Sequence, residues 1–285
     1  LLIILNFKTM KKIYILTILT ILLFTNCEKV IEVSVPSIEP KLIIDASFEV
    51  LFNQNPIATN SVVKLSLSAD YFDNTIQTVT NATVFLTNLS NNEVYVFSDL
   101  DANGNYEPIN SFFPSDNTEY ELTVIHENET FKGKAIKVKS NKINDIQQGD
   151  ETLFSGEEIE LKISFTDEVA VENYYLFNID IYNYITIEDR YFDGSEYNFS
   201  YFYEDDDIEF PKNIAIKMSG VSKEYYTYFR VLINQSGQNA GGPFQSVPSS
   251  LLGNMINTTN EANFPLGYFH ISETDTFNID LIDKN

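Results

Sequence analysis

Cysteine, tryptophan and histidine are scarce in this sequence. Its 285 residues include one cysteine, Cys27, no tryptophan, and two histidines, His126 and His270. A disulfide cannot form within a chain that has one cysteine, so the fold depends on its packed core. The two distant histidines lack the spacing of a zinc site, and no G-x-S-x-G segment marks a nucleophile elbow. We therefore expect structural roles for both histidines and no enzymatic activity.

Basic residues are also few. The chain has 18 lysines and arginines against 41 aspartates and glutamates, which gives a formal net charge of −23. Such an acidic chain is repelled by nucleic acid and by anionic lipid. We therefore expect no nucleic-acid partner and no polybasic membrane patch. Hydrophobic residues make up 44% of the chain and aromatic residues 14%, which is enough for one large or two ordinary domains.

The first apolar run of the sequence is too short to span a membrane. Residues 13–24 are uncharged and mostly apolar, and they follow Lys11 and Lys12, whereas a spanning helix needs about 20 apolar residues. This order is typical of a secretory signal peptide. The run ends in Phe-Thr-Asn-Cys, which resembles a bacterial lipobox, although Asn26 replaces the small residue that is usual before the cysteine. In a lipobox the cysteine thiol after the cleavage site receives a lipid.

From this pattern we predict that residues 1–26 are a signal peptide and that residues 1–9 precede the true start, Met10. Cys27 is then lipidated and anchors the chain to a membrane. Cleavage removes three lysines from the 18 basic residues and leaves 15 against 41 acids, a formal charge of −26. The alternatives are an ordinary signal peptide with a chance cysteine, or an uncleaved anchor.

Strand-like alternation begins at Lys41 and recurs along the chain. Val63, Leu65 and Leu67 alternate with polar residues, and the segment 157–166 alternates in the same way. A period of two indicates a strand with one solvent-facing side. Short strands separated by clusters of Asn, Gly, Asp and Ser are typical of antiparallel sandwiches. The predicted fold class is therefore mainly β.

The alternation stops at one polar segment, which we interpret as a domain boundary. Beyond it, Val221, Tyr225, Phe229 and Leu232 recur at helical spacing after a cap residue, Ser222, and predict one helix. The expected parts are a lipidated tether at 27–40, an N-terminal immunoglobulin-like β-sandwich at 41–139, a linker at 140–152, and a second antiparallel β domain at 153–285 with a packed helix near 220–235.

The C-terminal segment GNMINTTNEANFPLGYF, residues 253–269, carries a family resemblance. Together with the lipobox, the early strand PKLIIDASF and the tyrosine-rich helix, it resembles the domain-of-unknown-function family numbered 4249, which consists of Bacteroidetes-type outer-membrane lipoproteins. The resemblance covers roughly residues 27–285. It implies an outer-membrane lipoprotein, often encoded beside a TonB-dependent receptor, and it implies no reaction.

The sharpest local motif is DLDANGNYE. Asp99, Asp101 and Asn103 precede Gly104 as in the first half of an EF-hand loop, where alternate oxygens bind Ca²⁺. Such a loop has a bidentate acid at its twelfth position, where this chain has Asn110. The same residues also form the pattern of a hairpin turn with Gly104 at positive φ. The missing acid favours the turn, so Ca²⁺ is the weaker alternative and no other cofactor is expected.

Acidic and aromatic residues gather in the predicted second domain. An acidic run that suits a basic partner or a solvated loop consists of Glu204, Asp205, Asp206 and Asp207. Tyr201 and Tyr203 precede this run within a predicted long loop at 189–211. Long loops concentrate function, so we expect a partner to contact this region.

A second tyrosine-rich segment lies on a predicted strand at 173–188. Tyr174, Tyr182 and Tyr184 share a face of that strand with Asn178 and Asp180. The face is either a solvated binding surface or an ordinary amphipathic sheet face.

These observations leave three hypotheses of different classes. The leading one is a non-enzymatic, membrane-anchored binding or accessory lipoprotein that works with an outer-membrane transporter or another envelope protein. The second is an extracytoplasmic hydrolase that uses a pair of carboxylates, which a pocket with two carboxyls of raised pKa would favour. The third is a surface adhesin or structural module.

Overall fold

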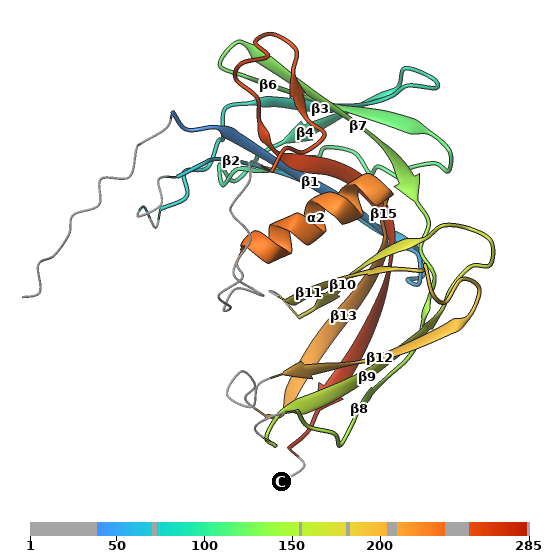
Figure 1. Ribbon diagram of the computed structural model, residues 1–285. Helices are drawn as coiled ribbons and strands as arrows, with labels where there is room; N and C mark the ends of the chain where they lie inside the picture. Colours follow the sequence, from blue (N-terminus) through green and yellow to red (C-terminus); the bar gives the residue numbers. More distant parts are fainter. Residues whose placement is uncertain are drawn as a thin grey trace, which may run out of the picture. The chain divides into compact units, whose positions relative to one another are not determined.

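The computed structural model describes residues 39–69, 73, 75–153, 156–180, 183–203, 210–236 and 251–283 (Figure 1). The predicted signal peptide and Cys27 lie outside these residues. The chain from Glu39 onward forms one compact unit. No helix in the described part of the chain is long and apolar enough to cross a membrane.

The described residues are mainly β, as predicted, and contain one helix, α2 (Lys223–Gln235). The strands are β1 (Leu42–Leu51), β2 (Ala58–Leu67), β3 (Thr83–Asn88), β4 (Val94–Ser98), β5 (Asn105–Pro108), β6 (Glu119–His126), β7 (Glu129–Val138), β8 (Ile143–Gln148), β9 (Ile159–Thr166), β10 (Tyr174–Ile179), β11 (Asn183–Glu188), β12 (Glu196–Tyr203), β13 (Lys212–Gly220), β14 (Ile256–Asn257) and β15 (Leu266–Leu281).

Eight of these strands close into a ring. Their order is β15-β1-β2-β5-β4-β3-β6-β7, and β7 pairs back onto β15. β15 runs parallel to both β1 and β7. Alternation along each strand sends apolar side chains inward, so Ile44, Leu65 and Leu122 are almost completely buried in one core. The region predicted as an immunoglobulin-like sandwich therefore forms most of a closed sheet, because β15, from the far end of the chain, joins β1 to β7.

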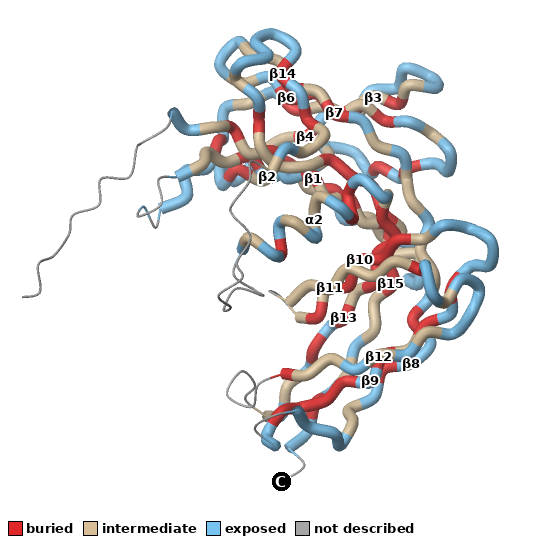
Figure 2. Tube along the Cα trace, in the orientation of Figure 1, coloured by how far each residue is buried: buried red, intermediate tan, exposed pale blue. Residues whose placement is uncertain are grey.

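The second half of β15 belongs to another part of the fold. It pairs with β13, and the sheet continues through β10 to β11. A separate three-stranded sheet, β12-β9-β8, packs against it. Phe165, Phe177 and Leu281 come from the two sheets and share one core. Buried segments accordingly occur on strands of both sheets in Figure 2.

The predicted helix is confirmed, but one side of it differs from the prediction. Ser222 is the N-cap, and its hydroxyl accepts a hydrogen bond from the Tyr225 backbone N–H at 3.2 Å. Tyr225 is buried as expected and Phe229 packs in the same cluster, whereas Leu232 is 36% exposed. The inward positions are filled by Tyr226 and Ile233 instead.

The structure divides the chain differently from the sequence-based prediction. The expected linker at 140–152 contains β8, which pairs with β9. β15 pairs with β1 from the expected first domain and with β13 from the second. Parallel pairing between residues more than 200 positions apart leaves no local signal in a sequence, so the boundary was drawn where none exists.

Two further predictions about strands are wrong. The expected long strand at 173–188 is two strands, β10 and β11, with Asp180 at a φ of 65° after the first. The expected loop at 189–211 contains β12, which pairs along its whole length with β9. The aromatic residues of that segment alternate inward, as in any half-buried strand.

Candidate binding surface beside helix α2

The sheet formed by β1, β15, β13, β10 and β11 has two unlike faces. Paired residues of neighbouring strands share a face. Asp45 is paired with Tyr268 and Ser47 with His270, while their chain neighbours Ala46 and Phe269 point into the core. One face is therefore apolar, and the other carries polar and aromatic side chains. Helix α2 lies beside this second face (Figure 1).

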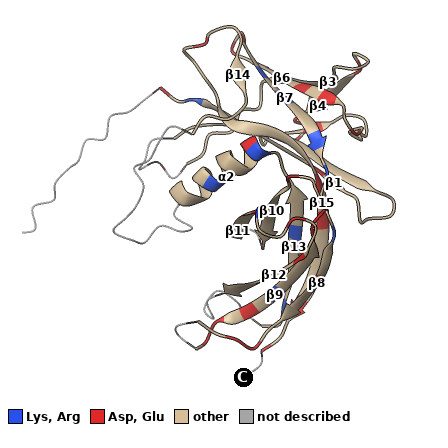
Figure 3. Ribbon diagram, turned by 45° about the vertical axis from the view of Figure 1, so that its right-hand side comes forward, with Lys and Arg blue, Asp and Glu red and all other residues tan. Residues whose placement is uncertain are grey.

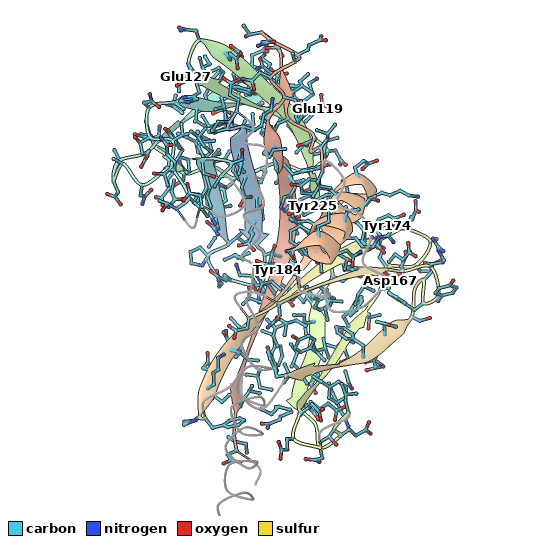
Figure 4. All side chains as sticks on the ribbon, turned by 60° about the vertical axis from the view of Figure 1, so that its left-hand side comes forward. Glu119, Glu127, Asp167, Tyr174, Tyr184 and Tyr225 are labelled. Atoms are coloured by element: carbon cyan, nitrogen blue, oxygen red, sulfur yellow. The ribbon has the colours of Figure 1, made fainter. Side chains whose placement is uncertain are left out.

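Aromatic rings cover the polar face next to α2. We call the set the tyrosine cluster; it consists of Tyr184, Tyr225, Tyr228, Phe229 and Tyr268. Tyr225 is at its centre, with ring centroids 4.9 Å from Tyr268, 5.5 Å from Phe229 and 6.1 Å from Tyr228. Tyr184 on β11 contacts Phe229 edge to face at 5.1 Å. Figure 4 shows Tyr184 and Tyr225 together with Tyr174 around the helix. Each such ring pair contributes about 0.5–1.5 kcal/mol beyond its buried area.

Asp45 places a carboxylate next to these rings. Its side chain is exposed, and the Ser47 hydroxyl donates to Asp45 Oδ1 at 3.0 Å. Ser47 also hydrogen-bonds the side chain of Tyr225. A chain of contacts therefore runs from the buried tyrosine through a serine to a carboxylate that reaches solvent.

The negative charge of Asp45 raises the pKa values of nearby tyrosines. Burial, followed by the negative charge of Asp45, raises the pKa of Tyr228 to about 12. The same two causes raise the pKa of Tyr184 and, further, that of Tyr225. All three hydroxyls therefore stay protonated near neutral pH and can donate hydrogen bonds.

A buried histidine, His270, packs against the tyrosine cluster. The His270 ring stacks on Tyr225 with a centroid distance of 3.8 Å, and its Nδ1 lies 3.1 Å from Ser272 Oγ. Burial lowers the pKa of His270 to about 3. The imidazole is therefore neutral and has a packing role, as we expected from the sequence.

A second carboxylate of the same face is already neutralised. Glu49 lies two strand positions beyond Ser47 and binds Lys217 on β13, with Nζ–Oε distances of 2.7 and 3.0 Å. Basic residues on α2 and β13 are visible in Figure 3. No lysine or arginine of the described residues forms an ion pair with Asp45. Within the described residues, the carboxylate of Glu49 is therefore paired with a cation and that of Asp45 is not.

A separate group of three aspartates lies where the loops before β10 and β12 meet. Oxygens of Asp167, Asp189 and Asp193 lie within 4.8 Å of one another. The pKa of Asp189 is raised, chiefly by burial. The hydrogen bond from the backbone N–H of Asn173 lowers this pKa, and the charges of Asp167 and Asp193 raise it further. The carboxylates also accept backbone hydrogen bonds: Asp167 from Gly194 at 3.0 Å, and Asp189 from Asn173 at 2.7 Å. The group therefore ties the two loops together.

A shallow hollow lies on the outer face of β12-β9-β8. Its volume is about 410 Å³, and most of the residues that line it are polar, Asp145, Lys162, Ser164, Asn198 and Ser200 among them. Phe199 is the one aromatic residue of this lining, whereas the surface beside α2 has several.

The predicted Ca²⁺ residues form a turn between β4 and β5. Asp99 accepts hydrogen bonds from the backbone N–H groups of Asn103 at 3.1 Å and Gly104 at 2.9 Å. Gly104 has a φ of 84°, as the hairpin interpretation requires. Asp101 is exposed in the same turn. Both oxygens of Asp99 thus stabilise the turn, and Ca²⁺ binding by this segment stays a prediction.

The predicted partner residues do not form a surface together. The acidic run at 204–207 lies outside the described residues. Tyr203 is only 3% exposed and belongs to the core, so its assignment to a contact surface is wrong. Tyr201 is half-buried and packs against Tyr203 at 4.8 Å. Both tyrosines follow the inward alternation of β12, which the sequence prediction had treated as a loop.

Asp45 and Ser47 were not singled out from the sequence. The segment LIIDASFEVL alternates strictly, and this pattern already places Asp45, Ser47 and Glu49 on one face. The distance in sequence between β1, α2 and β15 concealed that this face meets the tyrosines. The prediction that Tyr174, Tyr184 and Asn178 share one face agrees with the register, since Asn178 is paired with Tyr184.

Comparisons with known proteins give a family match over most of the chain and a weak structural likeness. No curated protein matches the sequence. A solved structure of the FN1–FN3 domains of chicken CNTN1 matches with 14% identity over 65% of this chain and 60% of that one, at a TM-score of 0.18, so this chain spans less than two thirds of its length. A likeness at this TM-score carries no argument about the fold. The model of the family described as "Domain of unknown function (DUF4249)" matches residues 28–278. The chain therefore belongs to the DUF4249 family.

Proposed function

We propose that this protein is a lipid-anchored outer-membrane lipoprotein that acts by binding a partner, as an accessory subunit of a TonB-dependent transporter or another envelope protein. The observation that carries the proposal is the polar face beside α2, where an exposed carboxylate meets a cluster of tyrosines on a rigid sheet. Tyrosines supply a large contact area at low entropic cost, and they are enriched at interfaces.

The membrane anchor in this proposal rests on the sequence. A positively charged start, a short apolar run and Cys27 occur in the order of a lipoprotein signal. The family match begins at residue 28, directly after that cysteine. The anchor supplies proximity to an envelope partner, and the folded unit from Glu39 onward supplies the surface.

Fractionation of a bacterium that expresses the complete chain tests the anchor. We expect the wild-type protein in the outer-membrane fraction and Cys27→Ser in the soluble fraction. A Cys27→Ser variant that stays with the membrane without detergent would exclude the lipid anchor. Pull-down of the crosslinked wild-type protein then tests the partner. We expect an outer-membrane transporter in near-equal amount, and its absence in repeated pull-downs would overturn the accessory role.

One observation favours the hydrolase as a second candidate. Asp189 is a buried carboxyl with a raised pKa beside Asp167, as a general acid beside a carboxylate would be. However, Asp167 already accepts hydrogen bonds from Tyr175 and from Gly194. This arrangement suits a structural junction better than a reactive pair, and we therefore rank binding first.

A further inference from the structure

Asp45 is the starting point of an inference about what the surface binds. Its exposed carboxylate accepts one hydrogen bond within the described residues, from Ser47 at 3.0 Å. Glu49 on the same face instead binds the ammonium of Lys217. Lys64 is the strand partner of Asp45 on β2 but forms no ion pair with it in the described residues, so the carboxylate of Asp45 can bind a cation from solution.

The rings beside Asp45 favour the same type of ligand. The negative face of an aromatic ring attracts a cation that lies within about 6 Å of its centroid. Tyr184, Tyr228 and Tyr268 are partly exposed, and their positions are fixed by contacts with Phe229 and Tyr225. A cation at Asp45 would therefore meet both a carboxylate and ring faces, and both interactions stabilise it.

We propose that Asp45 and the tyrosine cluster bind the guanidinium group of an arginine side chain from a partner protein. This inference rests on the proposed binding function and specifies its chemistry. A metal ion fits the site poorly, because a hard cation needs six or more oxygen ligands and aromatic faces supply none. A guanidinium fits better than an ammonium, because it is planar, stacks on rings and pairs with a carboxylate through two parallel hydrogen bonds.

The polar groups around Asp45 complete the match. A guanidinium has five N–H donors, and Asp45 offers two carboxylate oxygens, one of which also accepts from Ser47. Tyr268 is the strand partner of Asp45, and the hydroxyl oxygens of Tyr184 and Tyr228 lie close enough for the charge of Asp45 to raise their pKa. These oxygens can accept the donors that the carboxylate leaves unpaired.

Titration with a small arginine analogue tests the inference directly. The probe is N-acetyl-arginine amide, added to the complete mature chain made soluble by Cys27→Ser, with binding followed by calorimetry or NMR. We expect saturable binding that weakens about tenfold in Asp45→Asn and in Tyr228→Ala, as the loss of a charged or cation–aromatic contact predicts. N-acetyl-lysine amide should bind several-fold more weakly, and high salt should weaken both.

A matched control separates this site from the general negative charge of the protein. Glu107 on β5 is also an exposed carboxylate, and β2 separates its strand from the strand of Asp45. Glu107→Gln should bind the probe as the wild type does. Equal weakening in Glu107→Gln and Asp45→Asn, no effect of Asp45→Asn, or no saturable binding would each overturn the inference. Tyr228→Phe, which retains the ring, provides the test if Tyr228→Ala unfolds, and it should keep most of the affinity.

The two proposals fail in different ways. If pull-down recovers a transporter equally with wild type and with Asp45→Asn, the arginine site is wrong and the accessory function stands. If the arginine analogue binds at Asp45 but no envelope protein is recovered, the site stands and the accessory function is wrong.

Discussion

A buried imidazole makes the stability of this protein depend on pH. Burial lowers the pKa of His270 from 6.5 to about 3 in the folded chain. Between these two values the unfolded state binds a proton that the folded state does not. The free energy of unfolding therefore falls as the pH drops through this window, by about 1.4 kcal/mol per pH unit from this residue.

Replacing His270 should remove this part of the pH dependence. We expect His270→Asn to show a flatter dependence than the wild type in urea unfolding measured between pH 6 and pH 4. Ser272→Ala keeps the imidazole and loses only its hydrogen-bond partner, so it should keep the wild-type slope. If His270→Asn has the same slope as the wild type, the histidine is not buried as described.

Asp189 affects the pH dependence of stability with the opposite sign to His270. Its raised pKa means that the folded state favours the protonated carboxyl. The stability contributed by this group is present below the unfolded pKa, near 3.8, and is lost as the pH rises through the folded pKa. At neutral pH this residue therefore makes the folded state less stable than an uncharged side chain of the same shape would.

Asparagine at this position keeps the shape and cannot ionise. We expect Asp189→Asn to melt at a higher temperature than the wild type at pH 7, with a gain that disappears below about pH 4. Asp101→Asn changes an exposed turn and should leave stability within about 0.5 kcal/mol at both pH values. A lower melting temperature for Asp189→Asn at pH 7 would show that the carboxylate of Asp189 stabilises the loops in its ionised form.

At the scale of single elements, helix α2 depends on the sheet that it covers. A 13-residue helix is marginal in water without tertiary contacts. Its buried side chains are Tyr225, Tyr226 and Ile233, whereas Leu232 is partly exposed. Tyr225→Ala should therefore cost about 3–5 kcal/mol of stability.

Leu232→Ala provides the contrast on the same helix. It removes a side chain that is more than one third exposed, and it should cost less than about 1 kcal/mol. Denaturant unfolding of both variants measures the difference. Similar losses for the two would mean that the helix lies on the sheet in another rotation.

The elements with strict alternation could be predicted from the sequence, and those that depend on distant contacts could not. Residues 159–166 and 119–126 show apolar residues at every second position and form β9 and β6. β12 has the same alternation, but its apolar positions are all aromatic and lie beside an acidic run, so it was assigned to a loop. The surface formed by Asp45 and the tyrosine cluster combines β1, α2, β11 and β15, and neither periodicity nor spacing connects these segments.

At the scale of the whole molecule, β15 determines how the chain is divided. Its 16 residues close the ring through β1 and β7 and then pair with β13, from which the sheet continues to β10 and β11. Gly267 lies where β15 meets β1, with a φ of 95°, and a Cβ at this position would collide with the carbonyl of Ile44. The approach of these two strands is therefore close and specific. The chain folds as one unit because one strand belongs to both of its parts.

This shared strand predicts that the N-terminal part cannot fold alone. A fragment of residues 39–139 contains seven of the eight ring strands but lacks β15, so the ring stays open between β1 and β7. The core around Phe48 would lose Phe269 and Ile271, which are fully buried in the intact chain. Exposing such a core and two strand edges costs several kcal/mol, comparable to the total stability of a domain. We expect the fragment to show no cooperative thermal unfolding.

As the matched control, the same fragment followed by a Gly/Ser linker of about 15 residues and residues 251–274 restores β15 beside β1 and β7. This fusion should unfold cooperatively. Cooperative unfolding of the fragment without β15 would instead show that residues 41–139 are a domain of their own.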